Sequence, residues 1–429
     1  MNTTTTPAGA VSWVGEQFGV EVHGHSTAQS PWAIDDLIIV GLRRNRRRAH
    51  LLVSTVLGKH IPTPPRAVRA AADDLGDAVI AAVGADAASH ATVLGFAETA
   101  TGLGHCVAAR ISARAYIHST RRQATGVPSW GTFEEGHSHA TTHLLQPADT
   151  ELLTTDTDAP MILVDDEIST GTTALRAITA LHDRAPRTHY VVASLVDMCT
   201  DAHRATIAAA ATEMGVRIDQ VSLAQARILL PDSIVDEVWA LEPGALNPVG
   251  DHRGQVTTLH LPWPDGLPDG GRHGFLRSDA ATFDAAISVA AERIREVIDP
   301  SGDVVVVGHE ELMYLPLCLA EALEDSGVSA RYQTTTRSPA YVRDVDGYPL
   351  RRGFTFTAPE SDPGTPRFVY NLVSPFTASE SEVLPQVVLV IDAPADTDLL
   401  REPGGVVDVL TAAGHDVIVA VVPTGGPRE

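Results

Sequence analysis

Lysine is almost absent from this sequence, since thirty of its 31 basic residues are Arg and Lys59 is the single Lys. The skew is typical of a GC-rich coding bias, in which Arg replaces Lys wherever either residue serves. The one Lys that survives indicates a position that needs a compact ammonium group rather than a planar guanidinium. Retention by chance is the alternative explanation.

Cysteine and long apolar runs are scarce as well. Cys106, Cys199 and Cys318 lie far apart and form no CxxC pair, which argues against a disulfide framework and a structural zinc site. No apolar run reaches the roughly 18 residues of a membrane helix. The stretch from Met1 to Gln17 lacks the basic-then-apolar pattern of a signal peptide. We therefore expect a cytoplasmic protein.

Positive charge is in short supply, because 54 acidic residues face 31 basic ones and the formal net charge is −23. Such a surface repels phosphate backbones and anionic lipids, so we expect neither a nucleic-acid nor a membrane partner. An anionic ligand then requires a local cluster of positive groups. With 429 residues, 44% of them hydrophobic, the chain can fill two or three domains of about 150 residues each.

Short aliphatic runs alternate with Ala-rich, helix-prone stretches over most of the chain. Strands without polar alternation, each followed by a helix, predict an α/β fold with a parallel sheet covered on both faces. The expected strands span 50–56, 91–95, 115–118, 161–164, 190–196, 220–223, 304–307, 331–335, 368–372 and 387–391. The expected helices of the first half span 65–83, 102–113, 172–183 and 201–214.

A Pro- and Gly-rich stretch over 242–274 divides the chain. We predict an N-terminal extension at 1–40, a first unit at 41–245, a linker at 246–274 and a second unit at 275–429. The second unit echoes the first: segments from Val93, Tyr116, Thr142 and Ile162 parallel segments from Val306, Gln333, Tyr370 and Leu389. An internal duplication explains this likeness, and so does the independent similarity of two Rossmann-like units.

The segment MILVDDEISTGTT, residues 161–173, is the most informative one. Two adjacent carboxylates at the end of a buried strand are costly unless a ligand or a cation compensates them. The Thr- and Gly-containing loop that follows offers backbone N–H groups and hydroxyls at the start of a helix, which is a site for an anion. Carboxylates beside a phosphate cradle indicate a ligand that is both a sugar and a phosphate.

This segment resembles the phosphoribosyl pyrophosphate (PRPP) motif of the type I phosphoribosyltransferases. The resemblance implies that Asp165 and Asp166 bind the ribose hydroxyls, directly or through Mg²⁺. It also implies that the loop residues Ser169, Thr170, Gly171, Thr172 and Thr173 hold the 5′-phosphate. Glu167 lies next to the acids. Some purine enzymes carry an acidic base two positions further on, where this chain has Ser169.

Further charged residues follow other expected strands. The run from Gly41 to Pro65 holds five Arg and then Gly58-Lys59-His60. In this fold the turn after the strand at 91–95, which carries Glu98, commonly faces the pyrophosphate. On an acidic protein, pyrophosphate needs local positive charges, and we expect it to bind to Lys59, Arg121 and Arg122. Gly58, in the turn before Lys59, belongs to the same expected site. We expect catalytic roles for Lys59, Arg121, Glu167 and His137.

A histidine-rich segment, FEEGHSHATTHLL, spans 133–145. The spacing of His137, His139 and His143 is open to a metal site, to surface histidines without a role, or to a loop that closes over PRPP. The chain order of the type I enzymes favours the loop, with Glu134 and Glu135 at its base.

A second resemblance concerns Thr336-Arg337-Ser338-Pro339. It is similar to the TRSP domain that follows orotate-phosphoribosyltransferase-like domains encoded beside tellurium-resistance genes. The implied fold is a parallel sheet flanked by helices, followed by a degenerate Rossmann-like unit. That unit keeps only Asp392 of the motif, so we expect it to line the acceptor pocket with Arg337, or to form an intersubunit contact, rather than to bind PRPP.

The resemblance implies a Mg²⁺-dependent transfer of the phosphoribosyl group from PRPP to a small-molecule acceptor, with release of pyrophosphate. It also implies a role in nucleotide biosynthesis and a homodimer. Two alternatives remain open: a PRPP-binding regulator without turnover, and an enzyme of the same fold that cleaves a nucleotide.

Overall fold

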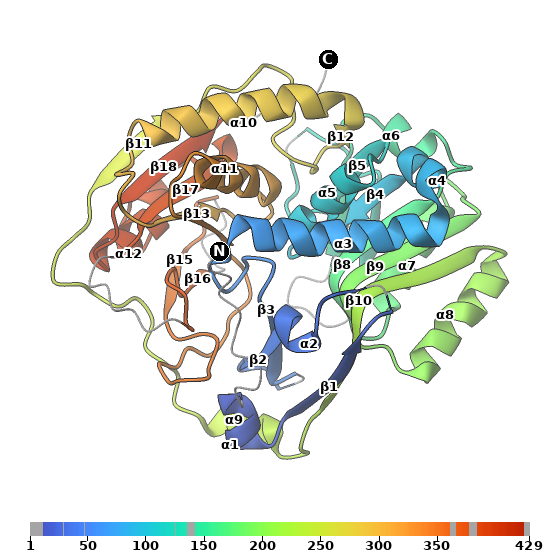
Figure 1. Ribbon diagram of the computed structural model, residues 1–429, viewed down its shortest axis with the longest axis horizontal. Coiled ribbons are helices and arrows are strands. Elements are labelled where there is room, and N and C mark those ends of the chain that lie inside the picture. The colour runs from blue at the N-terminus through green and yellow to red at the C-terminus, as the bar shows by residue number, and fades with distance from the viewer. Residues whose placement is uncertain are drawn as a thin grey trace.

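The structure, a computed structural model, describes residues 12–28, 30–46, 48–124, 126–134, 142–360, 366–376 and 384–423. Two sheets lie side by side, each with helices packed against it (Figure 1). The predicted α/β class is confirmed. None of the described helices combines the length and the apolar character that crossing a membrane requires.

The first sheet is parallel at its centre. The two edge strands run antiparallel to their neighbours, and aliphatic side chains fill the central strands on both faces. In spatial order its strands are β1 (Glu21–Ser26), β10 (Arg217–Leu229), β9 (His189–Asp197), β8 (Met161–Ile168), β4 (Thr92–Gly95), β5 (Ala115–His118) and β12 (Phe275–Leu276).

The second sheet is parallel throughout. In spatial order its strands are β11 (Val256–His260), β18 (Val417–Val422), β17 (Gln386–Asp392), β13 (Val304–Gly308) and β14 (Ala330–Thr334). Three antiparallel hairpins stand apart from the sheets: β2 (Ile38–Leu42) with β3 (His50–Ser54), β6 (Gly131–Glu134) with β7 (Thr142–Leu145), and β15 (Gly353–Thr357) with β16 (Pro366–Tyr370).

The longer helices cover these sheets. They are α3 (Pro65–Val83), α5 (Thr101–Arg110), α7 (Thr172–His182), α8 (Asp201–Met214), α10 (Ala280–Arg295) and α11 (Tyr314–Asp325). Shorter ones are α1 (Trp13–Phe18), α2 (Ile34–Leu37), α4 (Ala85–His90), α6 (Glu151–Thr154), α9 (Ile234–Ala240) and α12 (Val406–Ala412). Helix α3 begins with Pro at a position where the missing N–H costs nothing. It packs with α5 against α11, so one hydrophobic core joins the two halves.

We call the first sheet with its helices and the hairpins β2–β3 and β6–β7 the first unit. The second sheet with its helices, the hairpin β15–β16 and the loops that join them form the second unit. The order β9, β8, β4, β5 in one sheet matches β18, β17, β13, β14 in the other. The connections also match, because helices precede β4 and β13 in the chain, and the hairpins β6–β7 and β15–β16 lie between β5 and β8 and between β14 and β17. This shared topology supports the internal duplication.

The strand register corrects three of the predicted equivalences. Gly95 pairs with His118 and Gly308 pairs with Thr334, so Tyr116 corresponds to Tyr332 rather than to Gln333. Gly95 pairs with Val164 and Gly308 pairs with Val390, so Asp392 occupies the position of Asp166 rather than of Asp165. Bridges from Thr120 to Leu144 and from Thr336 to Phe368 align the hairpins four residues away from the predicted match of Thr142 with Tyr370. Hydrogen bonding between strands fixes these equivalences, and letter similarity between short apolar runs does not detect such shifts.

The ends of the predicted units contain more structure than expected. The segment 246–274, expected to be a linker, contributes β11 to the edge of the second sheet. The segment 1–40, expected to be an extension, contributes β1, which pairs with β10. Both are edge strands, whose weaker apolar patterns give little signal in the sequence.

Candidate functional site

A cavity of about 430 Å³ lies at the carboxyl ends of β4 and β8. In parallel sheets ligands bind at this edge. Its walls come from both units: the β2–β3 hairpin, the turn at Lys59, the turn after β4, the end of β8 with the loop into α7, and the segment that follows β14.

The loop from Ser169 to Thr173, here called the motif loop, joins β8 to α7 along the cavity wall. Gly171 has a φ of 74°, in the left-handed region that favours Gly. A Cβ atom there would lie 2.5 Å from the Cδ1 atom of Ile207. Thr170 accepts a hydrogen bond from the Thr172 backbone N–H at 3.3 Å. The strand, the Gly turn and the helix start therefore have the arrangement that the sequence predicted.

Asp165 and Asp166 are half-buried at the cavity wall. The backbone N–H of Asp166 donates to Oδ1 of Asp165 at 3.0 Å, which orients that carboxylate. Carboxylate oxygens that remain partly open to solvent are the donors that Mg²⁺ prefers, because the ion keeps several of its waters. The donor chemistry of this pair therefore fits the ion.

Glu167 faces the β2–β3 hairpin. Its carboxylate pairs with the Arg48 guanidinium at 2.5 Å, and its second oxygen is buried without a hydrogen-bond partner. Burial raises the pKa of Glu167, and neighbouring Asp166 adds to the effect, while Arg48 opposes it. A carboxyl group with a raised pKa at a cavity wall is a candidate for proton exchange with a ligand.

Lys59 also lines the cavity, and its ammonium donates to Oγ1 of Thr99 at 2.5 Å. Gly58 has a φ of 69°, and a Cβ there would lie 2.6 Å from the Tyr332 ring, so this turn requires Gly. We call residues 58–60 the Lys59 turn. The turn places the only Lys of the chain in the lining of the same cavity as the motif loop.

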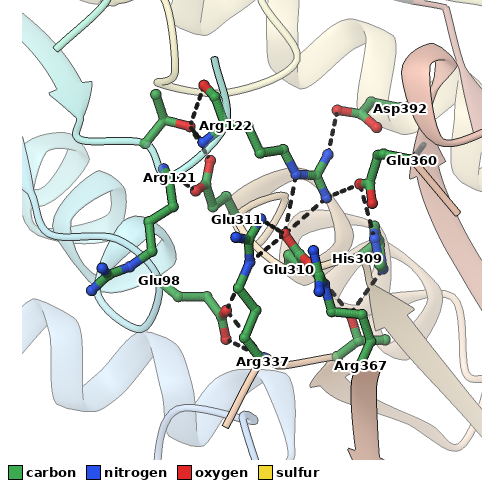
Figure 2. A network of polar contacts seen from close by, with 12 residues as sticks. Glu98, Arg121, Arg122, His309, Glu310, Glu311, Arg337, Glu360, Arg367 and Asp392 are labelled. Atoms are coloured by element: carbon green, nitrogen blue, oxygen red, sulfur yellow. Dashed lines mark hydrogen bonds and ion pairs between the residues drawn. The ribbon is translucent and has the colours of Figure 1, made fainter. Parts of the chain in front are cut away.

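The two adjacent arginines after β5 point to different places. Arg121 lines the cavity and donates to His143 and to the Ala97 carbonyl, both at 3.3 Å. Arg122 points into the second unit, where it pairs with Glu310, Glu360 and Asp392 (Figure 2). Of this pair, Arg121 is therefore the one placed at the cavity, whereas we predicted both for pyrophosphate.

Part of the histidine segment is placed as well. His143 is buried, accepts or donates a hydrogen bond with Ser119 at 2.8 Å, and lines the cavity. Glu134 is exposed and accepts a hydrogen bond from Thr142. Glu135, His137 and His139 lie outside the described residues.

Arg337 brings the second unit into the site. It lines the cavity together with Thr336, Ser338 and Pro339, and it pairs with Glu310 at 2.8 Å. Its backbone N–H donates to Glu98, another lining residue, at 3.2 Å. Among the described lining residues the cations are Arg43, Arg44, Arg48, Lys59, Arg121 and Arg337, and the acids are Glu98, Asp165, Asp166 and Glu167. Cations therefore exceed acids at this cavity of a strongly acidic chain.

A buried network of ion pairs surrounds Glu310, the partner of Arg337, and it was not predicted from the sequence (Figure 2). Glu310 is fully buried and pairs with Arg122, Arg337 and Arg367. Burial alone would raise the pKa of Glu310, but these arginines and His309 hold it well below its usual value. The adjacent acids of VVGHEEL, directly after a buried strand, were the available signal.

His309, Glu310 and Glu360 offer ligand atoms within 4.8 Å of one another, a spacing that a metal ion could use. Each carboxylate is already paired with Arg122, and Glu310 with two further arginines. Positive guanidinium groups this close repel a cation. We assign no metal to this group.

Comparisons with known proteins agree on the domain content. Residues 37–227 match a family described as phosphoribosyl transferase, and residues 269–410 match the TRSP domain described as C-terminal to it. The comparison with curated proteins finds no match.

Solved structures give weaker likenesses. Adenine phosphoribosyltransferase from Trypanosoma brucei is 16% identical with a TM-score of 0.28, over 47% of this chain and 76% of that chain. Orotate phosphoribosyltransferase from Aeropyrum pernix is 18% identical with a TM-score of 0.27, over 47% of this chain and 92% of that chain. TM-scores this low give no information on activity.

Proposed function

Because this chain carries a phosphoribosyl transferase domain followed by a TRSP domain, we propose that it transfers the phosphoribosyl group of PRPP to a small-molecule acceptor and releases pyrophosphate. One observation supports the proposal: the Asp165–Asp166 pair and the motif loop line the same cavity as Lys59 and Arg121. PRPP carries a phosphate at one end, hydroxyls in the middle and pyrophosphate at the other. The cavity lining contains groups suited to each of these three parts.

In this proposal the motif loop holds the 5′-phosphate. Its backbone N–H groups lie at the first turn of α7, where the helix dipole favours an anion. Thr170, Thr172 and Thr173 add hydroxyls. The ribose hydroxyls then lie beside Asp165 and Asp166.

The pyrophosphate end lies against Lys59, Arg121 and Arg337. Asp165 and Asp166 would hold Mg²⁺, which when bound neutralises charge on the pyrophosphate. In the transfer, the bond from C1′ to the pyrophosphate oxygen breaks and its electron pair leaves with pyrophosphate. An acceptor atom bonds to C1′ from the opposite face and releases its proton. Removal of one preorganised donor to such a developing charge typically costs about 2.7–4 kcal/mol of barrier.

The acceptor would bind between the β2–β3 hairpin and the end of β8, where Arg48 pairs with Glu167. Glu167 is the titratable group at this end of the cavity with a raised pKa, and we propose that it takes the proton that the acceptor loses. Arg48 orients the carboxylate and opposes the rise of its pKa.

The test is pyrophosphate release from PRPP in the presence of Mg²⁺ and a panel of nitrogen heterocycles and amines. Transfer predicts release that depends on one class of acceptor and that is lost in Asp165→Asn. A regulator would bind PRPP without release under any acceptor, and an enzyme that cleaves nucleotides would act on nucleotide and pyrophosphate in the reverse direction.

A further inference from the structure

The second unit contacts the site at the turn that carries the only Lys. The Thr334 backbone N–H donates to the Gly58 carbonyl at 2.8 Å, and the Asn371 side-chain amide donates to the His60 carbonyl at 2.8 Å. Both partners belong to the second unit, and Lys59 lies between the two carbonyls. The backbone position of Lys59 is therefore fixed by the second unit.

Two further contacts hold this segment in place. Tyr332 of β14 exchanges backbone hydrogen bonds with Thr63 at 2.9 Å in both directions. Asn371 has a φ of 60° and also donates to the Pro349 carbonyl at 2.9 Å. An Asn in this left-handed conformation, buried and with both amide hydrogens used, has one orientation available.

The contacts between the units are reciprocal. Glu98 lies three residues after Gly95 and accepts from the Arg337 backbone N–H, and Glu311 lies three residues after Gly308 and accepts from the Arg121 backbone N–H at 2.7 Å. Each unit thus orients the arginine that follows the equivalent strand of the other. Reciprocal contacts between equivalent residues are also what two subunits related by a twofold axis make, and here both units belong to one chain.

The equivalent positions of the two units differ in their access to ligands. In the first unit Asp166 is half-buried at an open cavity. In the second unit the equivalent Asp392 is 2% exposed, accepts from Arg272 at 2.9 Å and lies 3.6 Å from Arg122. Two guanidinium groups therefore lie against the carboxylate to which a ligand cation or hydroxyl would otherwise bind.

We propose that the second unit acts as a built-in partner subunit: it completes the one active site by clamping the Lys59 turn through Asn371 and by supplying Arg337 as a substrate-binding residue, while its own equivalent site is closed. This inference rests on the proposed function. Asn371 and Glu310 are positioning residues, acting through Lys59 and Arg337 respectively.

The test is calorimetric titration of PRPP, at millimolar Mg²⁺, into the full-length chain. We expect one site per chain. Arg337→Ala weakens binding about tenfold to a hundredfold, the range for a lost charge-assisted hydrogen bond. Arg337→Lys, which keeps the charge, gives a smaller loss. Thermal unfolding without ligand checks that each variant is folded.

A double-mutant cycle separates positioning from general stability. Asn371→Gly keeps the left-handed backbone and removes the clamp, and we expect it to weaken PRPP binding in the natural chain but not in a Lys59→Ala background. Asp392→Asn leaves one site per chain, whereas Asp166→Asn removes binding.

The outcomes distinguish the two proposals. No heat from the natural chain overturns the proposed function and this inference with it. Binding by the natural chain that Arg337→Ala leaves unchanged, two sites per chain, or an equal effect of Asn371→Gly in both backgrounds overturns this inference alone.

Discussion

Glu98 and Glu311 hold equivalent positions in the two units, and each accepts a hydrogen bond from the backbone N–H of an arginine in the other unit, at 3.2 Å from Arg337 and at 2.7 Å from Arg121. A carboxylate that follows a strand of one unit therefore orients the turn that follows a strand of the other unit. Both arginines line the cavity. The site is consequently a property of the whole chain rather than of its first half.

Loss of the Lys59 ammonium should weaken PRPP binding without unfolding the protein. Lys59→Ala removes one charge from the pyrophosphate end, and a charge-assisted hydrogen bond contributes about 1.5–3 kcal/mol. Thr99→Val is the matched control, because it removes the acceptor of the Lys59 hydrogen bond and keeps the charge. Calorimetry should show a larger loss for Lys59→Ala. Equal affinities in both variants would contradict a role for the ammonium.

Gly171 should tolerate no side chain. Gly171→Ala costs about 1–2 kcal/mol for the left-handed backbone, and the added Cβ overlaps Ile207. We expect a lower unfolding free energy together with loss of PRPP binding, because the motif loop must move.

Gly215→Ala is the control for that substitution. Gly215 has a φ of 71°, close to that of Gly171, but a Cβ there meets nothing within 4 Å. The Gly215→Ala variant should have an unfolding free energy in urea that is lower by the cost of the left-handed backbone alone, and its affinity for PRPP should be unchanged. If Gly171→Ala behaved like Gly215→Ala in both measurements, the motif loop would not be the phosphate site.

The central strands and the motif loop could be predicted from the sequence because their signals are local. Four aliphatic residues before Asp165 fix a buried strand, and Gly171 with its flanking threonines fixes the turn. Asn371 gave no such signal, and the adjacent acids Glu310 and Glu311 indicated a polar strand end without indicating their partners. Their roles depend on carbonyls and guanidinium groups that lie up to hundreds of positions away in the chain. The direction of Arg122, opposite to that of Arg121, likewise follows from tertiary packing.

Acid should destabilise the junction between the units. Although burial opposes it, neighbouring arginines hold the pKa of Glu310, Glu311 and Asp392 below their usual values. The folded state then binds protons less tightly than the unfolded state, so this stability is complete above the unfolded pKa values and is lost as the pH falls below about 4.5. For each titrating group, the unfolding free energy should fall by about 1.4 kcal/mol per pH unit.

Urea unfolding between about pH 7 and about pH 3.5 measures this slope. Glu310→Gln should be less stable at neutral pH and should show a shallower decline in acid. A natural chain whose unfolding free energy stayed constant down to the lowest pH would contradict the assigned ion pairs.

Arg48 should set the proton affinity of Glu167. Burial raises the pKa of this carboxyl and Arg48 opposes the rise, so Arg48→Met should raise the pKa further. The acid side of the pH profile for pyrophosphate release should then move to higher pH, and Glu167→Gln should remove it. A profile that is the same in all three proteins would exclude Glu167 as the proton acceptor.

Calorimetric titration of PRPP with and without Mg²⁺ tests the central claim most directly. We predict binding to one site per chain, strongly weakened by a chelator and abolished in Asp165→Asn and Asp166→Asn, while both variants keep the thermal unfolding midpoint of the natural chain. Absence of binding by the natural chain, or unchanged affinity in both variants, would contradict the claim that this cavity holds an activated ribose phosphate.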